Sequence, residues 1–241
     1  MVEDLIPIDE ASKLIGVSID TLRRWDKSGK LLAIRPGKGS HRQYRKSDIE
    51  LFIRDLFQVA KVWSSHQLSQ KPNEEFYCPN SSIFQARLNK MESELDKIES
   101  VKEIFPLIVA VTGEIGNNSF DHNLGNWPDI IGIFFGYDLI KRVIVLADRG
   151  QGILKTLQRV KPELEMHNEA LRVAFTEKIS GRAPENRGNG LKFVKQVVAD
   201  NPISLIFHTG NAKLEMQAHD TKIKISTSDS SLRGCLALIR F

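Results

Sequence analysis

The sequence predicts two domains: a small, mainly helical domain with a β wing at the amino terminus, and a larger α+β two-layer sandwich after it. One observation is charge, because residues 18–46 hold nine Lys and Arg against two acidic residues, whereas residues 63–241 are balanced, with 22 basic and 21 acidic. A second is periodicity: helical apolar spacing dominates the start of the chain and later alternates with β-rich runs. The third is a polar stretch at 61–82 that contains two prolines. The expected division is a domain at 1–60, a linker and amphipathic helix at 61–100, and a domain at 101–241.

The composition is that of an ordinary folded protein of 241 residues, with 41% hydrophobic and 27% charged residues. No apolar run approaches the roughly 18 residues that a membrane-spanning helix needs, and the acidic amino terminus does not resemble a secretory leader. Cys78 and Cys235 lie far apart in the sequence, so we expect two reduced thiols and not a metal-ligand pair. These features predict a cytoplasmic protein that does not use a membrane as a partner.

The elements of the first domain follow from helical spacing and capping. Residues 9–15 place apolar groups at helical spacing, and a glycine ends that helix. Ser18 is a suitable N-cap for a second helix, and residues 31–44, rich in Gly, Lys and Arg, predict a β-hairpin with a basic tip. A third helix begins at Ser47 or Asp48. This order predicts a winged helix-turn-helix, with core side chains at Leu14, Val17, Leu22 and Trp25.

This segment resembles the MerR and excisionase-like winged-helix family over nearly all its length. In the first helix and turn the resemblance is carried by Ala11, Leu14, Gly16 and Val17, and in the second helix by the run TLRRW at 21–25. The family pattern GxHRxY for the wing is matched by residues 39–44, GSHRQY. The resemblance implies that double-stranded DNA is a partner.

Two groups of side chains are the expected DNA contacts. Thr21, Arg23 and Arg24 lie on the second helix, where they reach phosphates or base edges in the major groove. Lys38, His41 and Arg42 project from the wing toward backbone phosphates, although Arg42 has the alternative role of bracing the hairpin. A head of this size reads only a few base pairs, so we expect a homodimer.

The remaining residues predict helices on one side of a mainly antiparallel sheet. An amphipathic helix at 83–100 either packs on the second domain or pairs with its copy in a dimer. Further helices are expected at 104–122 and 188–200, and strands at 130–136, 142–147, 203–208, 212–217 and 234–240.

Three motifs in this part carry chemistry. Glu114 and Asn118 are four residues apart, so they share one face of a helix. The apolar run 143–147 leads into Asp148 and the glycines of a DxGxG motif. Asn186–Leu191 is a glycine-rich turn ahead of a helix, and the amides of a helix amino terminus favour a phosphate.

In their order and spacing these motifs resemble the histidine-kinase-like (GHKL) ATPase domain, which is shared by histidine kinases, gyrase, MutL and anti-sigma-factor kinases. The resemblance covers about residues 102–241 and implies ATP and Mg²⁺ as cofactors. It implies that Asn118 ligates Mg²⁺, that Glu114 activates a water where hydrolysis occurs, and that Asp148 accepts a hydrogen bond from the adenine amino group. Residues 153–186 occupy the place of the family's ATP lid. The other nucleotide-binding residues that the resemblance implies are Asp121, Gly150, Gly152, Arg187, Gly188, Gly190 and Leu191.

The combination predicts a DNA-binding transcriptional regulator whose domain at 101–241 binds ATP or ADP and controls dimerisation or placement of the head. Glu114 leaves slow Mg²⁺-dependent hydrolysis open. One alternative is a protein serine kinase of the anti-sigma-factor kinase type that is tethered to DNA, and another is a degenerate ATPase fold that binds a protein partner. The helix expected at 83–100 contains no histidine, which argues against an autophosphorylating kinase.

Overall fold

The computed structural model describes residues 5–15, 17–29, 31–35, 37, 40–53, 55–65, 70–177 and 190–241. The chain divides into two compact units, residues 1–59 and 60–241. Each unit has its own sheet and its own core.

The amino-terminal unit is a helix-turn-helix with a small sheet. β1 and β2 pair antiparallel, with Ile6 opposite Tyr44, and Ile34 forms an isolated bridge to Gln43 that extends the wing. The elements in order are β1 (Leu5–Pro7), α1 (Ile8–Ile15), α2 (Ile19–Ser28), β2 (Gln43–Arg45) and α3 (Lys46–Ile53).

Local interactions explain where α2 begins and ends. The Ser18 hydroxyl accepts a hydrogen bond from the Thr21 amide at 3.2 Å, and Gly29 ends the helix with a left-handed φ of 75°. Buried against α2 is Tyr44, whose hydroxyl donates to the Leu22 carbonyl at 3.3 Å. The helix-turn-helix prediction is therefore confirmed.

The predicted core of this unit needs one correction. Val17 and Leu22 are buried, and the ring of Trp25 packs on that of Phe52 with centroids 5.0 Å apart. Leu14 is 49% exposed, so its assignment to the core was wrong. The reason is that α1 has only eight residues and makes its buried contact at Ala11, which leaves Leu14 at the solvent-facing end of the helix.

The larger unit is an α+β domain with one antiparallel five-stranded sheet, as the sequence predicts. The strand order is β3-β4-β5-β7-β6, and β4 and β5 form a hairpin that pairs through β5 with β7. The elements in order are α4 (Leu56–Ser65), β3 (Tyr77–Cys78), α5 (Ser81–Leu95), a 3₁₀ turn (Glu99–Val101), α6 (Phe105–Asn123), β4 (Ile133–Asp138), β5 (Val143–Asp148), α7 (Gly152–Leu157), α8 (His167–Thr176), α9 (Gly190–Asp200), β6 (Ser204–Met216) and β7 (Lys224–Arg240).

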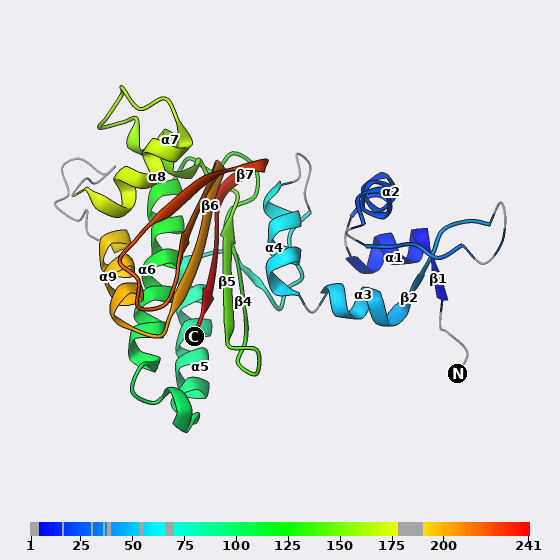
Figure 1. The fold of residues 1–241 in the computed structure, drawn as a ribbon, viewed down its shortest axis with the longest axis horizontal. Helices are drawn as coiled ribbons and strands as arrows, with labels where there is room; N and C mark the ends of the chain where they lie inside the picture. The colour runs from blue at the N-terminus through cyan, green and yellow to red at the C-terminus, as the bar shows by residue number, and fades with distance from the viewer. Residues whose placement is uncertain are drawn as a thin grey trace. The chain divides into compact units, whose positions relative to one another are not determined.

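Helices α5, α6 and α9 cover one side of this sheet (Figure 1). Four apolar side chains of α5 are buried in the shared core: Phe84, Leu88, Met91 and Leu95. Of the two roles predicted for the amphipathic helix, packing on the second domain is therefore the one observed. Because its apolar face is already buried, α5 gives no support to a dimer through this helix.

The opposite side of the sheet is also buried. Phe134, Val145 and Leu238 alternate with the side chains of the helix-side core and have almost no exposed surface. Residues 60–65, the end of α4, lie on this side of the sheet, and Trp63 is 7% exposed (Figure 1). The larger unit therefore buries both faces of its sheet.

Three differences from the predicted elements have local causes. β6 is one strand where two were expected, because the register shifts at Gly210, which has a φ of 53°, interrupt the sequence pattern without ending the pairing. The polar stretch predicted as a linker supplies the end of α4 and strand β3. The region predicted as a lid contains α7 and α8, while residues 178–189 lie outside the described part.

Among the described helices, none combines the length and apolarity needed to cross a membrane.

The close approach of α5 and α6 yields a prediction on stability. A Cβ at Gly116 would overlap the ring of Phe84, whereas one at Gly113 would lie 3.2 Å from the Leu88 Cδ2 atom. Replacing a mid-helix glycine by alanine gains up to ~1 kcal/mol of helix propensity, but overpacking costs about 1–3 kcal/mol. We expect Gly116→Ala to lower the free energy of unfolding and the control Gly113→Ala to leave it unchanged or raised, as measured by urea denaturation. Equal unfolding midpoints for the two variants would contradict this packing.

Candidate functional site

The predicted DNA contacts on α2 fall into two environments. Arg23 and Arg24 are exposed, and Arg23 pairs with Asp20 at 2.7 Å. Thr21 is 2% exposed, and its hydroxyl lies 2.9 Å from that of Ser18 in the cap of the helix. Both guanidinium groups are exposed, although Arg24 Nη2 also donates to the Thr21 hydroxyl at 3.3 Å. The geometry of Thr21 favours a role at the start of the helix over contact with a base.

Asp26 ties the wing to α2. Its carboxylate accepts hydrogen bonds from Arg42 Nε at 2.7 Å, from the Ala33 amide at 3.1 Å and from the guanidinium of Arg35. Burial by itself would raise the pKa of Asp26, but the bonds from Arg42, Ala33 and Arg35 outweigh it and hold the pKa below its ordinary value. For Arg42 this geometry favours the bracing alternative. His41, next to it, is exposed.

The larger unit buries the carboxylate that the sequence assigns to adenine. Asp148 is the last residue of β5 and is 2% exposed. It accepts hydrogen bonds from the Ser119 hydroxyl and from the Gly150 amide, both at 2.8 Å. Burial raises the pKa of Asp148 to about 6, although the bonds from Gly150, Ser119 and the Cys235 amide act in the opposite direction.

The predicted catalytic and metal-binding residues lie on α6, one turn before this contact. Asn118 Nδ2 donates to Glu114 Oε1 at 3.0 Å. Since the amide nitrogen makes this bond, the amide oxygen of Asn118 is left to face another partner. Ser119, which follows Asn118, holds Asp148, so α6 joins the first two motifs through adjacent residues.

Glycines allow the backbone to approach these side chains. A Cβ at Gly150 would overlap the Asn123 amide, whose oxygen accepts a hydrogen bond from the Gln151 amide at 2.8 Å. A Cβ at Gly190, the first residue of α9, would overlap the Glu114 carboxylate. The end of the third motif therefore lies against the first.

Two further glycines complete this neighbourhood. A Cβ at Gly234 of β7 would overlap Asp148, and Gly152 opens α7 with a left-handed φ of 74° close to the Thr209 hydroxyl. Asp148 is bonded to Ser119, which follows Asn118 on α6, and Glu114 contacts both Asn118 and the backbone at Gly190, so the three motifs are neighbours in the fold.

The remaining predicted residues are placed less completely. Asp121 is exposed on the next turn of α6, and Leu191 packs partly buried against the core. Arg187, Gly188 and Lys38 lie outside the described residues.

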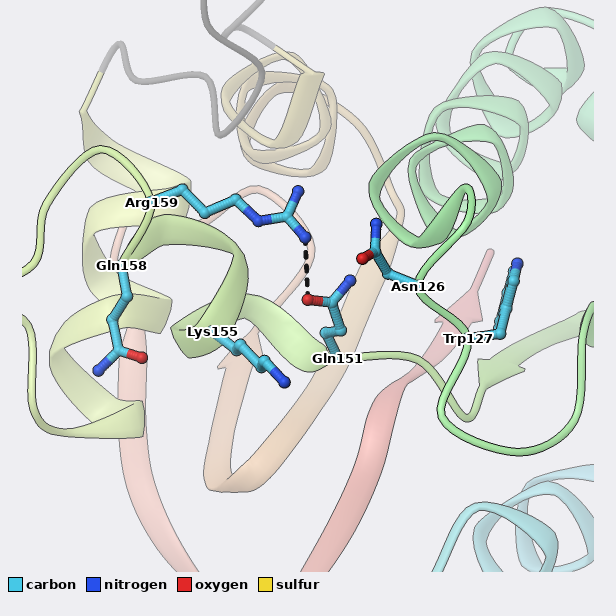
Figure 2. A pocket seen from close by; sticks show the side chains of 6 residues that line it. All are labelled: Asn126, Trp127, Gln151, Lys155, Gln158 and Arg159. Carbon is cyan, nitrogen blue, oxygen red and sulfur yellow. Dashed lines mark hydrogen bonds between the residues drawn. The ribbon is translucent and has the colours of Figure 1, made fainter.

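A depression of about 530 Å³ opens beside the DxGxG loop (Figure 2). Gln151 and Arg159 meet across it, with Arg159 Nη2 donating to Gln151 Oε1 at 2.9 Å. Asp148 and Asn118 are not part of its described lining, so the depression adjoins the motif residues without containing them. It is lined by Asn126, Trp127, Gln151, Lys155, Gln158 and Arg159.

Sequence reasoning missed the roles of Ser119, Asn123 and Arg149. Ser119 and Asn123 both lie on α6, yet nothing in a helical Ser or Asn indicates which distant group it will meet. Arg149 stands between the motif positions Asp148 and Gly150 and is fully buried, which a charged residue in a loop does not suggest.

The amino-terminal geometry agrees with a comparison to known families. Residues 7–44 match the family model described as MerR family regulatory protein. This MerR segment contains α1, α2 and the wing, and with them Arg23, Arg24, His41 and Arg42.

Two proteins share short stretches with the chain. The type II methyltransferase M.Eco47II of Escherichia coli is 33% identical over 63 residues, which are 26% of this chain and 15% of the methyltransferase. The transcriptional repressor DcmR of Methylorubrum extorquens is 41% identical over 51 residues, 21% of this chain and 19% of the repressor. The chain therefore spans less than a fifth of the length of either relative, and the MerR segment lies within its amino-terminal unit.

The raised pKa of Asp148 yields a prediction on stability. An Asp in an unfolded chain titrates near ~3.9, so folded Asp148, with a pKa of about 6, holds its proton more tightly. Protonation therefore favours the folded state, and stability falls as pH rises from about 4 to about 6 and is constant above that. We expect Asp148→Asn to raise the free energy of unfolding at neutral pH by about 1–3 kcal/mol, with a smaller gain toward pH ~4.

Denaturant titrations across this pH range measure the effect. Asp229→Asn is the matched control, because Asp229 is an exposed carboxylate on β7. It should keep the pH profile of the wild type. A loss of stability in Asp148→Asn that is the same at all pH values would show that the carboxylate is not buried as a costly charge.

Proposed function

We propose that this protein is a DNA-binding transcriptional regulator whose larger unit binds ATP with Mg²⁺. The match of residues 7–44 to the MerR family supports the DNA-binding half, and one similar protein is named a transcriptional repressor. The nucleotide half rests on a single observation. Contacts at Asp148, Ser119, Asn118, Glu114 and Gly190 bring all three sequence motifs to one place.

DNA binding uses the exposed cations of α2 and the wing. Arg23 and Arg24 present guanidinium groups that suit phosphates and the acceptor edge of guanine, and His41 is exposed on the wing. Asp26 holds the wing against α2 through Arg35 and Arg42, so both surfaces meet the duplex in a fixed arrangement. Electrostatic affinity of this kind weakens with salt. A homodimer and a cytoplasmic location belong to this proposal as expectations.

Adenine recognition uses Asp148. An ionised carboxylate only accepts hydrogen bonds, so it pairs with the exocyclic amino group of adenine. Guanine would place a carbonyl oxygen at the same position, and the carboxylate could not bond to it. A Cβ at Gly234 would overlap the Asp148 carboxylate, so the glycine at this position lets β7 pass directly against it. Leaving a buried polar group unpaired is costly, and this cost is the basis of the selectivity for ATP over GTP.

The phosphates lie toward Asn118, Glu114 and the start of α9. Within the described ranges, no group of three or more His, Cys, Asp or Glu side chains is placed to hold a metal ion. The side-chain oxygen of Asn118 would hold Mg²⁺ together with phosphate and water oxygens, because Mg²⁺ prefers oxygen ligands. When bound, Mg²⁺ would neutralise part of the negative charge of the phosphates. Glu114, held by Asn118 and lying against Gly190, is positioned to orient a water. Asp121, Arg187, Gly188 and Leu191 remain predicted phosphate-side residues.

Substitution on α2 tests the DNA-binding proposal. Arg24→Ala removes an exposed cation from α2 and is expected to cost about 1–3 kcal/mol in affinity if it contacts a base, or to reduce the salt dependence if it contacts a phosphate. The assay is fluorescence anisotropy with a labelled mixed-sequence duplex at two salt concentrations. Lys13→Ala, which removes an exposed charge from α1, is the matched control and should bind nearly as the wild type. Failure of the wild type to bind duplex at low salt would reject the proposal.

Replacement of the buried carboxylate tests the nucleotide proposal. Asp148→Asn exchanges an acceptor oxygen for a donor facing the adenine amino group, so ATP affinity should fall by about 1–3 kcal/mol. Calorimetry with ATP and GTP, with and without Mg²⁺, measures this, and Asp229→Asn serves again as the control. Equal binding of ATP and GTP by the wild type would contradict the assigned role of Asp148.

Labelled ATP separates the alternatives: transfer to a co-purified protein supports the serine kinase, and absence of binding supports the scaffold.

A further inference from the structure

Arg149 is a fully buried cation that follows Asp148 directly in the chain. Its Nε atom lies 3.2 and 3.1 Å from the two Asp129 oxygens, and its Nη2 atom lies 2.6 Å from Asp129 Oδ2. Its Nη1 atom donates to the backbone carbonyl of Trp63, and the guanidinium lies 5.9 Å from the centre of the Trp63 ring. One side chain therefore joins the loop before β4 to helix α4.

The contact with Trp63 is made at a helix end. Trp63 lies in the last turn of α4, where the carbonyls of a helix carry partial negative charge. A buried guanidinium is well suited to this position, because it donates to the Trp63 carbonyl and complements the helix dipole. Arg149 therefore acts as the carboxyl-terminal cap of α4.

The bond from Arg149 to Trp63 is not needed to neutralise the charge of Asp129. Asp129 is also paired with Arg233 of β7 at 2.9 Å. Burial by itself would raise the pKa of Asp129, but the bonds from Arg149 and the Ile130 amide and the charge of Arg233 together lower it. Asp129 is paired with both Arg149 and Arg233. The bond from Arg149 to the Trp63 carbonyl is therefore not needed to balance the charge of Asp129, and its effect is on the end of α4.

The position of Arg149 in the chain relates α4 to the nucleotide site. Consecutive residues of an extended chain point to opposite faces of a sheet. Asp148 points to Ser119 of α6 and Arg149 to Trp63 of α4. A shift of the backbone that carries Asp148 and Gly150 must therefore move the guanidinium against the end of α4.

Helix α4 also connects the two units. It runs without interruption from Leu56 to Ser65, and the boundary between the units falls inside it, between Val59 and Ala60. Whatever fixes or releases the end of α4 acts on the helix from which the DNA-binding unit extends.

We infer that Arg149 is the positioning residue that couples nucleotide binding at Asp148 to α4 and so to DNA binding. The inference rests on the proposed function of both units. Nucleotide binding favours one arrangement of the 148–150 loop, and the Arg149 bond to the Trp63 carbonyl is made to a different extent in the two arrangements. Coupling between two sites is reciprocal, so DNA must change ATP affinity by the same factor that ATP changes DNA affinity; couplings of this kind are typically about 5- to 150-fold.

The test measures both affinities in the full chain, each with and without the other ligand, using MgATP and the duplex bound by the wild type. The variants are Arg149→Lys, which keeps the charge but has a single ammonium in place of the fork, and Arg149→Met, which leaves Asp129 paired with Arg233. We expect both to bind MgATP alone within about threefold of the wild type while the coupling falls at least fivefold. Arg233→Met is the matched control, because it removes the other cation from Asp129 and leaves Arg149 on the Trp63 carbonyl. Its coupling should remain.

Hydrogen exchange of the α4 amides supplies a second measurement that needs no DNA. MgATP should change exchange across 56–65 in the wild type and in Arg233→Met, and should have little effect in the Arg149 variants. If neither Arg149 variant folds, α4 exchange that does not respond to MgATP in the wild type still overturns the inference.

The outcomes separate this inference from the proposed function. A wild type that binds neither MgATP nor DNA rejects the function, and the inference with it. A wild type that binds both, with neither ligand changing the affinity for the other, rejects the inference alone. Coupling that survives in both Arg149 variants, or that is lost equally in Arg233→Met, also rejects it, because the Asp129 ion pairs and not the cap on α4 would then be responsible.

Discussion

Two opposite charges, Asp148 and Arg149, are buried side by side at the end of β5, and the contacts around the sheet of the larger unit converge on them. Each charge must be satisfied within the protein, because an unpaired buried charge costs several kcal/mol. Asp148 is satisfied by α6 and by the glycine loop, and Arg149 by Asp129 and by the end of α4. These two neighbouring charges, on opposite faces of the sheet, are thus bonded to α6 on one face and to α4 on the other.

A comparable arrangement organises the amino-terminal unit. Asp26 is nearly buried and receives two arginines and a backbone amide, so the wing and the recognition helix α2 are held together by a carboxylate. Part of the basic surplus that marks this segment is therefore used internally. Arg23 and Arg24 remain exposed, and they carry more of the proposed recognition than the count of positive charges suggests.

Much of the fold could be predicted from the sequence where the signals are local. Capping by Ser18, the helical spacing on α5 and the apolar strand before Asp148 lead to elements that the structure contains. Predictions failed where tertiary contacts override local patterns. Leu14 has the right spacing for a core residue but lies at the open end of a short helix. Helix α4 begins at Leu56, inside the range assigned to the first domain, and runs on into the predicted linker. Gly210 looks like a strand end, although the ladder continues past it through a bulge.

The candidate site shows the same division. By itself, the sequence determined the residue types on which the proposed nucleotide chemistry rests. They are a carboxylate after a strand, an Asn four residues after a Glu, and glycines ahead of a helix, and they can be recognised because these motifs are short and continuous. Only the tertiary structure decided that Ser119 holds Asp148, that Gly190 lies against Glu114 and that Arg149 caps α4. These contacts join residues up to 86 positions apart. Their partners are chosen by the packing of the sheet between its helices, which no local pattern contains.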